Sequence, residues 1–516
     1  MASRAAILAL ARVEARRLLM HPAVLAGFAL FVGPWLYQSV TGDRGHRYPV
    51  LQDASWSSQL LLLLPAAGVA IAASLGALRE HRHGVTEQFG VQVLTPGART
   101  AAHLLALAPP VLVAAFLSAA RIGYLAAQPG AAGSVRFAEL GAAPLCVLLA
   151  GAVGVLAARL STSPVTAPLA VVGLAVFTLA AAVNSTSNWR WLAPVTVEPE
   201  TAAPLPMAAL WRPAGWHLLW LAGVAAVLSG SALRRAGARG WWFRGTVVCG
   251  ASGALLAASM QLGGVPSQVA HQRAELTLHP AATQSCEEHG RVTYCAFPGF
   301  QAWIPAWGQV ASGVLAQVPT QVAGERYAVR QRIMWTASGD GSSVVPPFAT
   351  WRKEDAAART AGAVTVGTLW GDGSSAGDTA SDEVAGFATR FAYRVVSGVP
   401  AEGERITLLC RSRAAVTLWL AGQSTPGSRQ ALRSSVSRSS GGLAFPLLGS
   451  ASGLAFQARS EQLALSLLDR PSNEVGARLR ANWALLTSPE TSVDEAARLL
   501  GVPAPAASEV AGEACS

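Results

Sequence analysis

Charged side chains are scarce in this 516-residue chain, and lysine is almost absent. Asp, Glu, Lys and Arg together make up 13% of the residues, whereas soluble globular proteins carry about 25%. Lys353 is the only lysine, so arginine supplies nearly all the positive charge behind the formal net charge of +10. A phosphate-binding loop ending in Gly-Lys-Ser/Thr is excluded, because Arg352 and Glu354 flank that lysine. The chain therefore cannot hydrolyse ATP by that route.

A zinc-peptidase signature is also missing, because the sequence holds no His-Glu-x-x-His pattern. We expect no catalytic residue, no bound metal and no cofactor. A further possibility is that the chain is a hydrolase whose site lies in the C-terminal half and whose motif is not recognised.

Long apolar runs dominate the first half of the chain. Hydrophobic residues make up 52% of the sequence, and a run of about 20 is enough to cross a hydrocarbon core of ~30 Å. Seven such runs cover residues 23–40, 57–78, 100–120, 140–158, 165–183, 217–233 and 245–262. The Pro109-Pro110 pair predicts a kink in the third run. The predicted fold is an α-helical polytopic membrane domain of about seven spans over residues 22–263, followed by an α+β extracytoplasmic domain over residues 264–516.

Arginines fall mostly on alternate loops between these runs. The loops expected inside hold Arg79, Arg82, Arg99, Arg159, Arg234, Arg235, Arg239 and Arg244. Because basic loops stay on the cytoplasmic side, the pattern predicts a multi-pass protein of the cell membrane with a cytoplasmic N-terminus. The odd number of spans then places residues 264–516 outside. Membrane lipids account for the basic charge, so no nucleic-acid partner is expected.

Residues 1–21 form a separate segment before the first run. Ile7, Ala11, Ala15 and Leu18 project on one face of a helix. The same segment carries the charged residues Arg12, Glu14, Arg16 and Arg17. The pattern predicts an amphipathic helix on the inner leaflet, with arginines toward anionic headgroups.

The loop over residues 79–99 is the most informative of the inner loops. Its marked positions are Arg79, Glu80, Arg82, Gly84, Thr86, Glu87, Thr95, Pro96 and Arg99. An ordinary charged loop is one interpretation. The other is that residues 4–235 resemble the permease subunits of ABC-2-type transporters. Those begin with an inner-leaflet helix that has a glutamate among arginines, and their second inner loop reads Arg-Glu, Gly-(x)-Thr-Glu, then Thr-Pro and a basic residue.

The resemblance implies that residues 79–99 dock on a separate ATP-binding cassette subunit and transmit its motion. It implies that ATPase binding is lost when Glu80 and Glu87 become alanine. A second permease copy or a paralogue would complete the pathway. The seventh run and the large C-terminal domain depart from the family pattern. The alternative is a membrane-anchored extracytoplasmic binding or sensor protein without transport activity.

The C-terminal half alternates between strand-like and helix-like segments. β-Branched and aromatic residues predict strands over residues 274–278, 291–297, 327–336 and 363–369. Helices are predicted over residues 300–318, 381–396, 405–422, 460–468, 474–486 and 493–500. Strands are thus expected early in this domain and helices late.

Four cysteines fall in the predicted outer domain, where an oxidising exterior permits disulfides. Cys286 and Cys295 are close in sequence and predict a hairpin disulfide. A metal site of Cys286, His289 and Cys295 is the weaker alternative, because no fourth ligand is evident. Cys410 and Cys515 are a possible second bridge.

Overall fold

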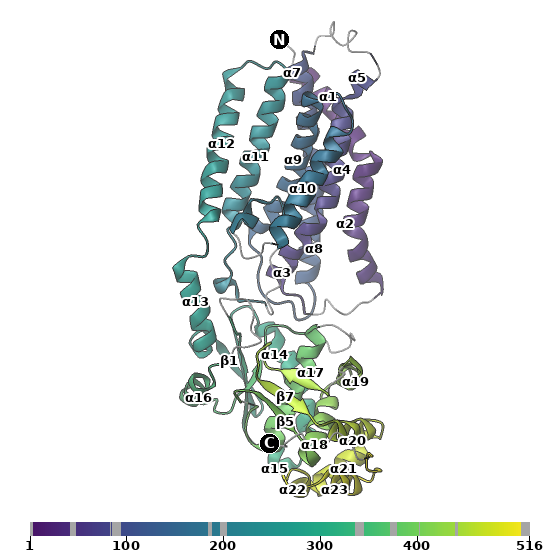
Figure 1. Ribbon diagram of the computed structural model, residues 1–516, viewed down its shortest axis with the longest axis vertical. Coiled ribbons are helices and arrows are strands. Elements are labelled where there is room, and N and C mark those ends of the chain that lie inside the picture. Colours follow the sequence, from purple (N-terminus) through teal and green to yellow (C-terminus); the bar gives the residue numbers. More distant parts are fainter. Residues whose placement is uncertain are drawn as a thin grey trace.

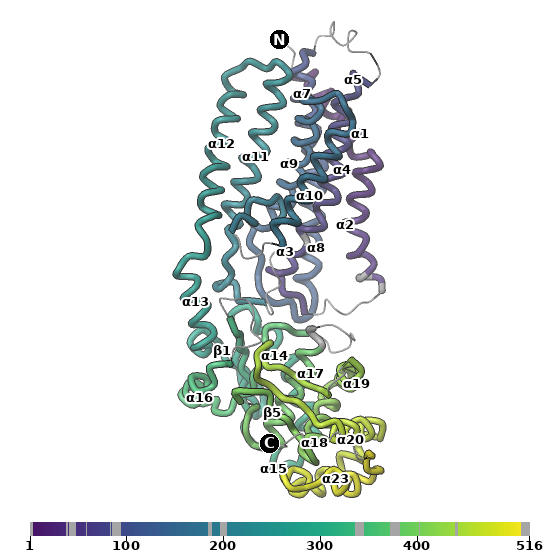
Figure 2. Tube along the Cα trace, viewed as in Figure 1, coloured from purple at the N-terminus to yellow at the C-terminus, as the bar shows by residue number. Residues whose placement is uncertain are grey.

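The chain has two structural parts, a bundle of long helices and a mixed helix–sheet domain (Figure 1). The computed structural model describes residues 4–41, 48–82, 84, 94–183, 188–196, 204–335, 345–371, 379–401, 403–438 and 442–506. The N-terminus lies at the end of the bundle that points away from the C-terminal domain (Figure 1). The tube view follows the chain from the last bundle helix through α13 into that domain (Figure 2).

The bundle contains the apolar runs as helices. Its elements are α1 (Arg4–Leu19), α2 (Pro22–Thr41), α3 (Leu51–Leu61), α4 (Leu63–Ala77), α5 (Arg79–Arg82), α7 (Pro96–Leu105), α8 (Ala108–Ala126), α9 (Phe137–Leu160), α10 (Thr166–Val183), α11 (Ala214–Arg235) and α12 (Trp241–Leu262). Among the described residues, six helical segments are long and apolar enough to cross a membrane. The pair α1 and α2, bent by 56°, raises the number to seven. This agrees with a membrane protein of six or seven spans.

The kink expected at Pro109-Pro110 is a break between two helices. α7 ends at Leu105, and α8 begins at Ala108 with the two prolines in its first turn. A proline in the first turn of a helix costs little, because the backbone N–H groups there have no intrahelical acceptor. The break therefore lies just before the prolines.

Small residues bring the bundle helices into close contact. A Cβ atom on Gly154 of α9 would lie 2.1 Å from the Ala70 carbonyl oxygen of α4, and one on Gly68 would lie 2.3 Å from the Ala23 carbonyl oxygen of α2. Backbones this close leave room only for hydrogen. Helices in lipid associate through such close packing, because no hydrophobic force acts between them.

The C-terminal domain contains two small sheets. Strands β1 (Ser285–His289), β2 (Val292–Ala296), β3 (Tyr327–Gln331) and β4 (Val364–Val366) form the first, in the order β1-β2-β3-β4, with only β1 antiparallel to its neighbour. Strands β5 (Ile406–Leu409), β6 (Ala444–Pro446) and β7 (Gly453–Phe456) form the second, in the order β5-β7-β6. The parallel pairs are joined by helices, as parallel pairing requires.

Helices surround these sheets. They are α13 (Ser267–Leu278), α14 (Ile304–Leu315), α15 (Thr320–Ala323), α16 (Phe348–Ala357), α17 (Thr379–Ser397), α18 (Arg411–Gly422), α19 (Ser428–Arg438), α20 (Ala458–Leu468), α21 (Ser472–Ala481), α22 (Trp483–Leu486) and α23 (Val493–Leu500).

Three predictions for this domain are wrong. Residues 274–278 belong to helix α13, whose buried residues Arg273 and Leu276 are three positions apart, as on a helix face. The single helix expected over residues 405–422 is instead strand β5 followed by α18, with Arg411 at φ 60° where the direction changes. Strands are not confined to the early part, because β5, β6 and β7 lie in the later half.

The C-terminal domain is packed onto the loops at the near end of the bundle. Ala132, Leu205 and Ala209 from these loops belong to the same buried cluster as the aromatic core of the domain. The Gly133 amide donates to the Gly299 carbonyl at 2.7 Å, and the Trp303 indole donates to the Gly130 carbonyl at 2.7 Å. The loops and the domain therefore share one hydrophobic core.

Candidate functional site

The residues predicted to form the docking loop lie at the end of the bundle opposite the C-terminal domain. Arg79, Glu80 and Arg82 form the short helix α5, and Thr95, Pro96 and Arg99 lie at the start of α7. Gly84 follows α5 with φ 67°, a left-handed conformation that suits glycine. Thr86 and Glu87 lie outside the described residues. Figure 1 places α5 beside the ends of α1 and α7.

Glu14 connects the first helix to α5. Its carboxylate is buried and accepts hydrogen bonds from Arg79 at 2.8 Å and from Arg17 at 3.1 Å. The predicted inner-leaflet helix thus turns Glu14 toward the bundle, while Arg12 and Arg16 are exposed. Because a buried carboxylate is costly without cationic partners, this contact fixes α1 against α5.

Glu80 connects α5 to α7. Its Oε1 atom lies 2.9 Å from Nε of Arg99, and both side chains are largely buried. Nη1 of Arg99 also donates to the Leu94 carbonyl at 3.1 Å. Glu80 therefore holds the beginning and the end of the 79–99 segment together, and its carboxylate faces inward.

The start of α7 is capped by its own sequence. The Thr95 hydroxyl accepts a hydrogen bond from the Ala98 amide at 3.2 Å, and Pro96 occupies the first helical turn. These are the residue types preferred at a helix start. The Thr-Pro pair of the predicted motif thus has a local structural role.

A cavity of about 190 Å³ opens beside these ion pairs. Its charged and imidazole-bearing lining residues are Glu14, Arg17, His21, Arg79, Arg82 and His103. His103 was not predicted as a site residue, because it lies inside an apolar run and reaches the cavity only through the packing of α7 against α1.

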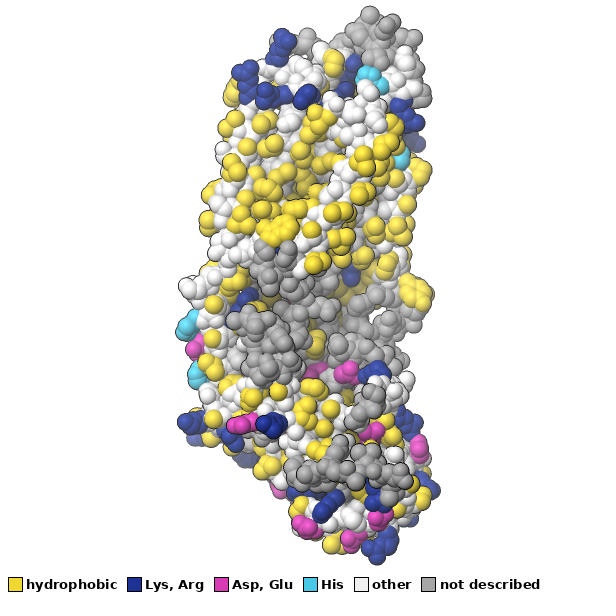
Figure 3. Space-filling view, viewed as in Figure 1, with side chains coloured by type: hydrophobic (Ala, Val, Ile, Leu, Met, Phe, Trp, Pro, Cys, Tyr) yellow, Lys and Arg dark blue, Asp and Glu magenta, His cyan; other side chains and the backbone are white. Residues whose placement is uncertain are grey.

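Arginine outnumbers acidic residues at this end of the bundle. On the face shown in Figure 3, arginines gather at the end that carries the N-terminus, hydrophobic side chains cover the adjoining length of the bundle, and acidic side chains lie in the other half. Among the described residues, Arg12, Arg16, Arg82, Arg159, Arg234, Arg235, Arg239 and Arg244 make no ion pair with a carboxylate. The exposed members of this group, such as Arg12, Arg82 and Arg244, present their charge to the surroundings of the chain.

The predicted disulfide between Cys286 and Cys295 is confirmed. The two residues are register partners in β1 and β2, and their sulfur atoms are bonded. This removes both thiols from the alternative metal site. Cys410 is also disulfide-bonded, and Cys515, the partner considered for it, lies outside the described residues.

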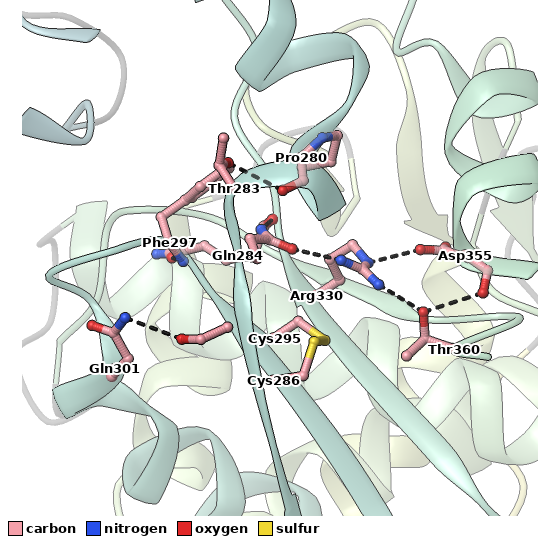
Figure 4. The surroundings of a disulfide bond; sticks show 12 residues. Pro280, Thr283, Gln284, Cys286, Cys295, Phe297, Gln301, Arg330, Asp355 and Thr360 are labelled. Atoms are coloured by element: carbon pink, nitrogen blue, oxygen red, sulfur yellow. Dashed lines mark hydrogen bonds and ion pairs between the residues drawn. A yellow bond between two sulfur atoms is a disulfide. The ribbon is translucent and has the colours of Figure 1, made fainter. Parts of the chain in front are cut away.

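A buried charge cluster beside this disulfide has no counterpart among the sequence predictions. Arg330 of β3 donates from Nε to Asp355 at 2.8 Å, and Arg332 pairs with the same carboxylate. Arg330 also reaches Gln284 and Thr360 (Figure 4), each at 2.7 Å. Burial lowers the pKa of Arg330, and the Asp355 charge opposes that shift. The cluster ties β3 to α16 and is structural, because its guanidinium and carboxylate groups are buried.

The sequence also contains a serine motif that was not among the predictions. Residues 373–377 read Gly-Ser-Ser-Ala-Gly, which has the Gly-x-Ser-x-Gly spacing of hydrolase nucleophile turns. They lie outside the described residues, and the expectation of no catalytic residue remains a prediction.

Comparison with protein-family models, with curated proteins and with solved structures gives no match to this chain.

Proposed function

We propose that this chain is the permease subunit of an ATP-driven transporter of the ABC-2 type, with a separate ATPase docking on residues 79–99. The observation that carries the proposal is the pair of ion contacts at this end of the bundle. Glu14 joins α1 to Arg79, and Glu80 joins α5 to Arg99. A docking segment needs such links to pass a displacement to the helices behind it.

The links lead directly into the bundle. α5 follows α4 after Leu78, and α7 precedes α8 across the break at residues 106–107. A push on α5 therefore acts on α4 through the chain, on α1 through Glu14 and on α7 through Glu80. Ion pairs with largely buried carboxylates suit this task, because they resist separation better than exposed pairs do. A second copy or a paralogue would supply the other half of the pathway.

The placement of charge and disulfide supports the orientation that this function needs. The arginine-rich end is typical of a cytoplasmic face, and the disulfide-bearing domain at the other end suits an oxidising exterior. In this orientation the ATPase meets residues 79–99 in the cytoplasm and the C-terminal domain lies outside.

Arg82 offers the sharpest test of docking. It is exposed at the end of α5 and makes no ion pair among the described residues. The full chain, purified from its native membranes in mild detergent, is expected to retain an ATPase subunit with a phosphate-binding loop. Arg82→Glu should lower the recovery of that subunit by about tenfold, because it reverses the charge that Arg82 would present to an acidic group of the ATPase.

Arg244→Glu is the matched control, since Arg244 is also exposed at this end of the bundle but lies on α12. Equal ATPase recovery from both variants, or none from the wild type, would overturn the docking assignment. Glu80→Ala is a poorer test, because that change breaks the internal contact with Arg99.

A membrane-anchored binding or sensor protein is the second candidate. It is favoured by a cavity of about 400 Å³ in the C-terminal domain, bounded by α17, α19 and β6. The cavity combines an apolar wall that includes Phe445 with the charged residues Asp382, Glu383, Arg390 and Arg438. An intact C-terminal domain with no ATPase in any preparation would favour this candidate.

A further inference from the structure

A second groove at the arginine-rich end has the chemistry of a phosphate site. It has a volume of about 440 Å³ and lies between α5, the start of α7 and the C-terminal ends of α9 and α11. Its polar lining residues are His81, Arg159, Ser161, Thr162 and Arg235. None of the described residues that line the groove is acidic.

Arg159 is the centre of the groove's charge. Its Nε and Nη2 atoms are buried, and no acceptor among the described residues reaches them. An unsatisfied buried guanidinium is costly. Its position in the last turn of α9 is explained in part by the helix dipole, but the dipole does not account for the other donors that line the same groove.

The other donors come from the loop after α9 and from the end of α11. The Ser161 hydroxyl already accepts a hydrogen bond from the Ser163 amide at 3.1 Å, so its own proton is left to donate. Thr162 and Arg235 are exposed. Pro96 of α7 also lines the groove, but it has no N–H to donate, and the Ala98 amide of the same helix turn is already bonded to Thr95. Two arginines and two hydroxyls are groups that proteins use to bind a tetrahedral oxyanion.

Glu80 is close enough to act electrostatically on Arg159, but neither local carboxylate forms an ion pair with it. Glu14 and Glu80, the acidic residues described at this end, are engaged by Arg79 and Arg99 at 2.8 and 2.9 Å. We propose that the groove formed by Arg159, Arg235, Ser161 and Thr162 binds a phosphate group. The group is carried either by the headgroup of an anionic phospholipid or by a soluble phosphate compound. The groove shares His81 and Pro96 with the proposed docking segment, but Arg82 does not line it.

The test uses the purified full chain and two probes. In the lipid arm, the chain is placed in nanodiscs of phosphatidylcholine with phosphatidylglycerol, and retained lipid is counted by native mass spectrometry. In the soluble arm, inorganic phosphate is titrated against the chain in neutral detergent, with the thermal unfolding midpoint as the readout. Arg159→Gln and Arg235→Gln remove groove charges, and Arg244→Gln removes an exposed arginine that does not line the groove.

A headgroup site is supported if both groove variants retain about tenfold less phosphatidylglycerol and Arg244→Gln does not. One charge-assisted hydrogen bond is worth about that factor. A soluble ligand is supported if inorganic phosphate raises the unfolding midpoint of the wild type but not of the two groove variants, and the wild type retains no excess of phosphatidylglycerol. Thr162→Ala keeps the test valid where Arg159→Gln fails to fold, because Thr162 is exposed. Groove variants that match Arg244→Gln in both arms would overturn the proposal.

Discussion

Arginine is used in opposite ways in the two parts of this molecule. In the C-terminal domain, ion pairs join Arg330 and Arg332 to Asp355, Arg390 to Glu383, Arg438 to Asp382 and Arg459 to Asp494. At the far end of the helix bundle, most of the described arginines have no carboxylate partner. Arg330, Arg332 and Arg390 are buried inside the C-terminal domain, whereas most of the described arginines at the bundle end face outward.

The surroundings explain the difference. A guanidinium within a folded core needs a carboxylate, because a buried unpaired charge costs several kcal/mol. A guanidinium at a membrane surface is solvated and is attracted by anionic lipids, so it needs none. The exceptions, Glu14 and Glu80, are therefore the informative residues at the bundle end: each is largely buried and each joins two segments.

Asp355→Ala should have the largest effect on stability. It leaves the guanidinium groups of Arg330 and Arg332 buried without their carboxylate. We expect the C-terminal domain to lose about 4 kcal/mol of unfolding free energy, measured by pulse proteolysis of the full chain across a urea gradient. Asp469→Ala, which removes the partner of the exposed Arg433, should cost less than about 1 kcal/mol. Equal losses in the two variants would break the distinction between buried and exposed arginine pairs.

Loss of the Cys286–Cys295 disulfide should have the next largest effect. The bond closes a hairpin with a sequence separation of 9, and a loop of that length gives about 3 kcal/mol. The double variant Cys286→Ala/Cys295→Ala should unfold at a correspondingly lower urea concentration. Cys249→Ala, which removes a free exposed thiol, serves as the control. In intact cells an impermeant thiol reagent should label Cys286 only after reduction, and labelling without reduction would contradict an oxidised exterior site.

The sequence carried enough information to predict the bundle but not all of the C-terminal domain. Apolar runs of about 20 residues have few possible structures, since a chain in lipid must satisfy its own backbone groups. The prolines at 109 and 110 therefore located a real break. The segment at 274–278 was misassigned, because five residues fit either period and only the packing of Leu276 decides between them.

The candidate site also combines features that the local sequence predicts with features that it does not. The Thr95-Pro96 pair is a local signal, and it begins a helix as its chemistry requires. The contact from Glu14 to Arg79 spans 65 residues and has no local signal. Arg159 stood out in the sequence only as one of several basic loop residues, and its place in a groove depends on how α7, α9 and α11 meet.

Glu14→Gln should have a moderate effect, centred on the bundle. The change removes the charge that Arg79 and Arg17 bind, which should cost about 2 kcal/mol because hydrogen bonds to a charged group are lost. The thermal unfolding midpoint of the purified chain should fall, and a disulfide engineered between α1 and α5 should form more slowly. Arg16→Gln on the exposed face of α1 should stay within about 0.5 kcal/mol of the wild type. A Glu14→Gln variant as stable as the wild type would mean that the contacts of Glu14 contribute no more to stability than the exposed Arg16 side chain does.

The smallest effect concerns a carboxylate in the C-terminal domain that has no arginine partner among the described residues. Glu461 of α20 is buried and accepts a hydrogen bond from the Leu443 amide at 3.1 Å. Burial raises the pKa of Glu461 above its ordinary value of 4.5, and the amide hydrogen bond partly opposes that shift. A raised pKa means that the folded state holds the proton more tightly than the unfolded chain does. Its contribution to stability is therefore present below pH 4.5 and is lost as the pH rises through the folded-state pKa.

In the Glu461→Gln variant the side chain is uncharged at every pH of the test, and it keeps an oxygen acceptor for the Leu443 amide. The stability of the C-terminal domain should therefore decline less between about pH 4.5 and pH 7 in this variant than in the wild type, because no buried group has to ionise. Pulse proteolysis of the full chain over that range measures the difference. The opposite result would be a wild-type domain that gains stability from Glu461 as the pH rises. It would show that Glu461 has a cationic partner, as Asp355 and Glu383 do in the same domain.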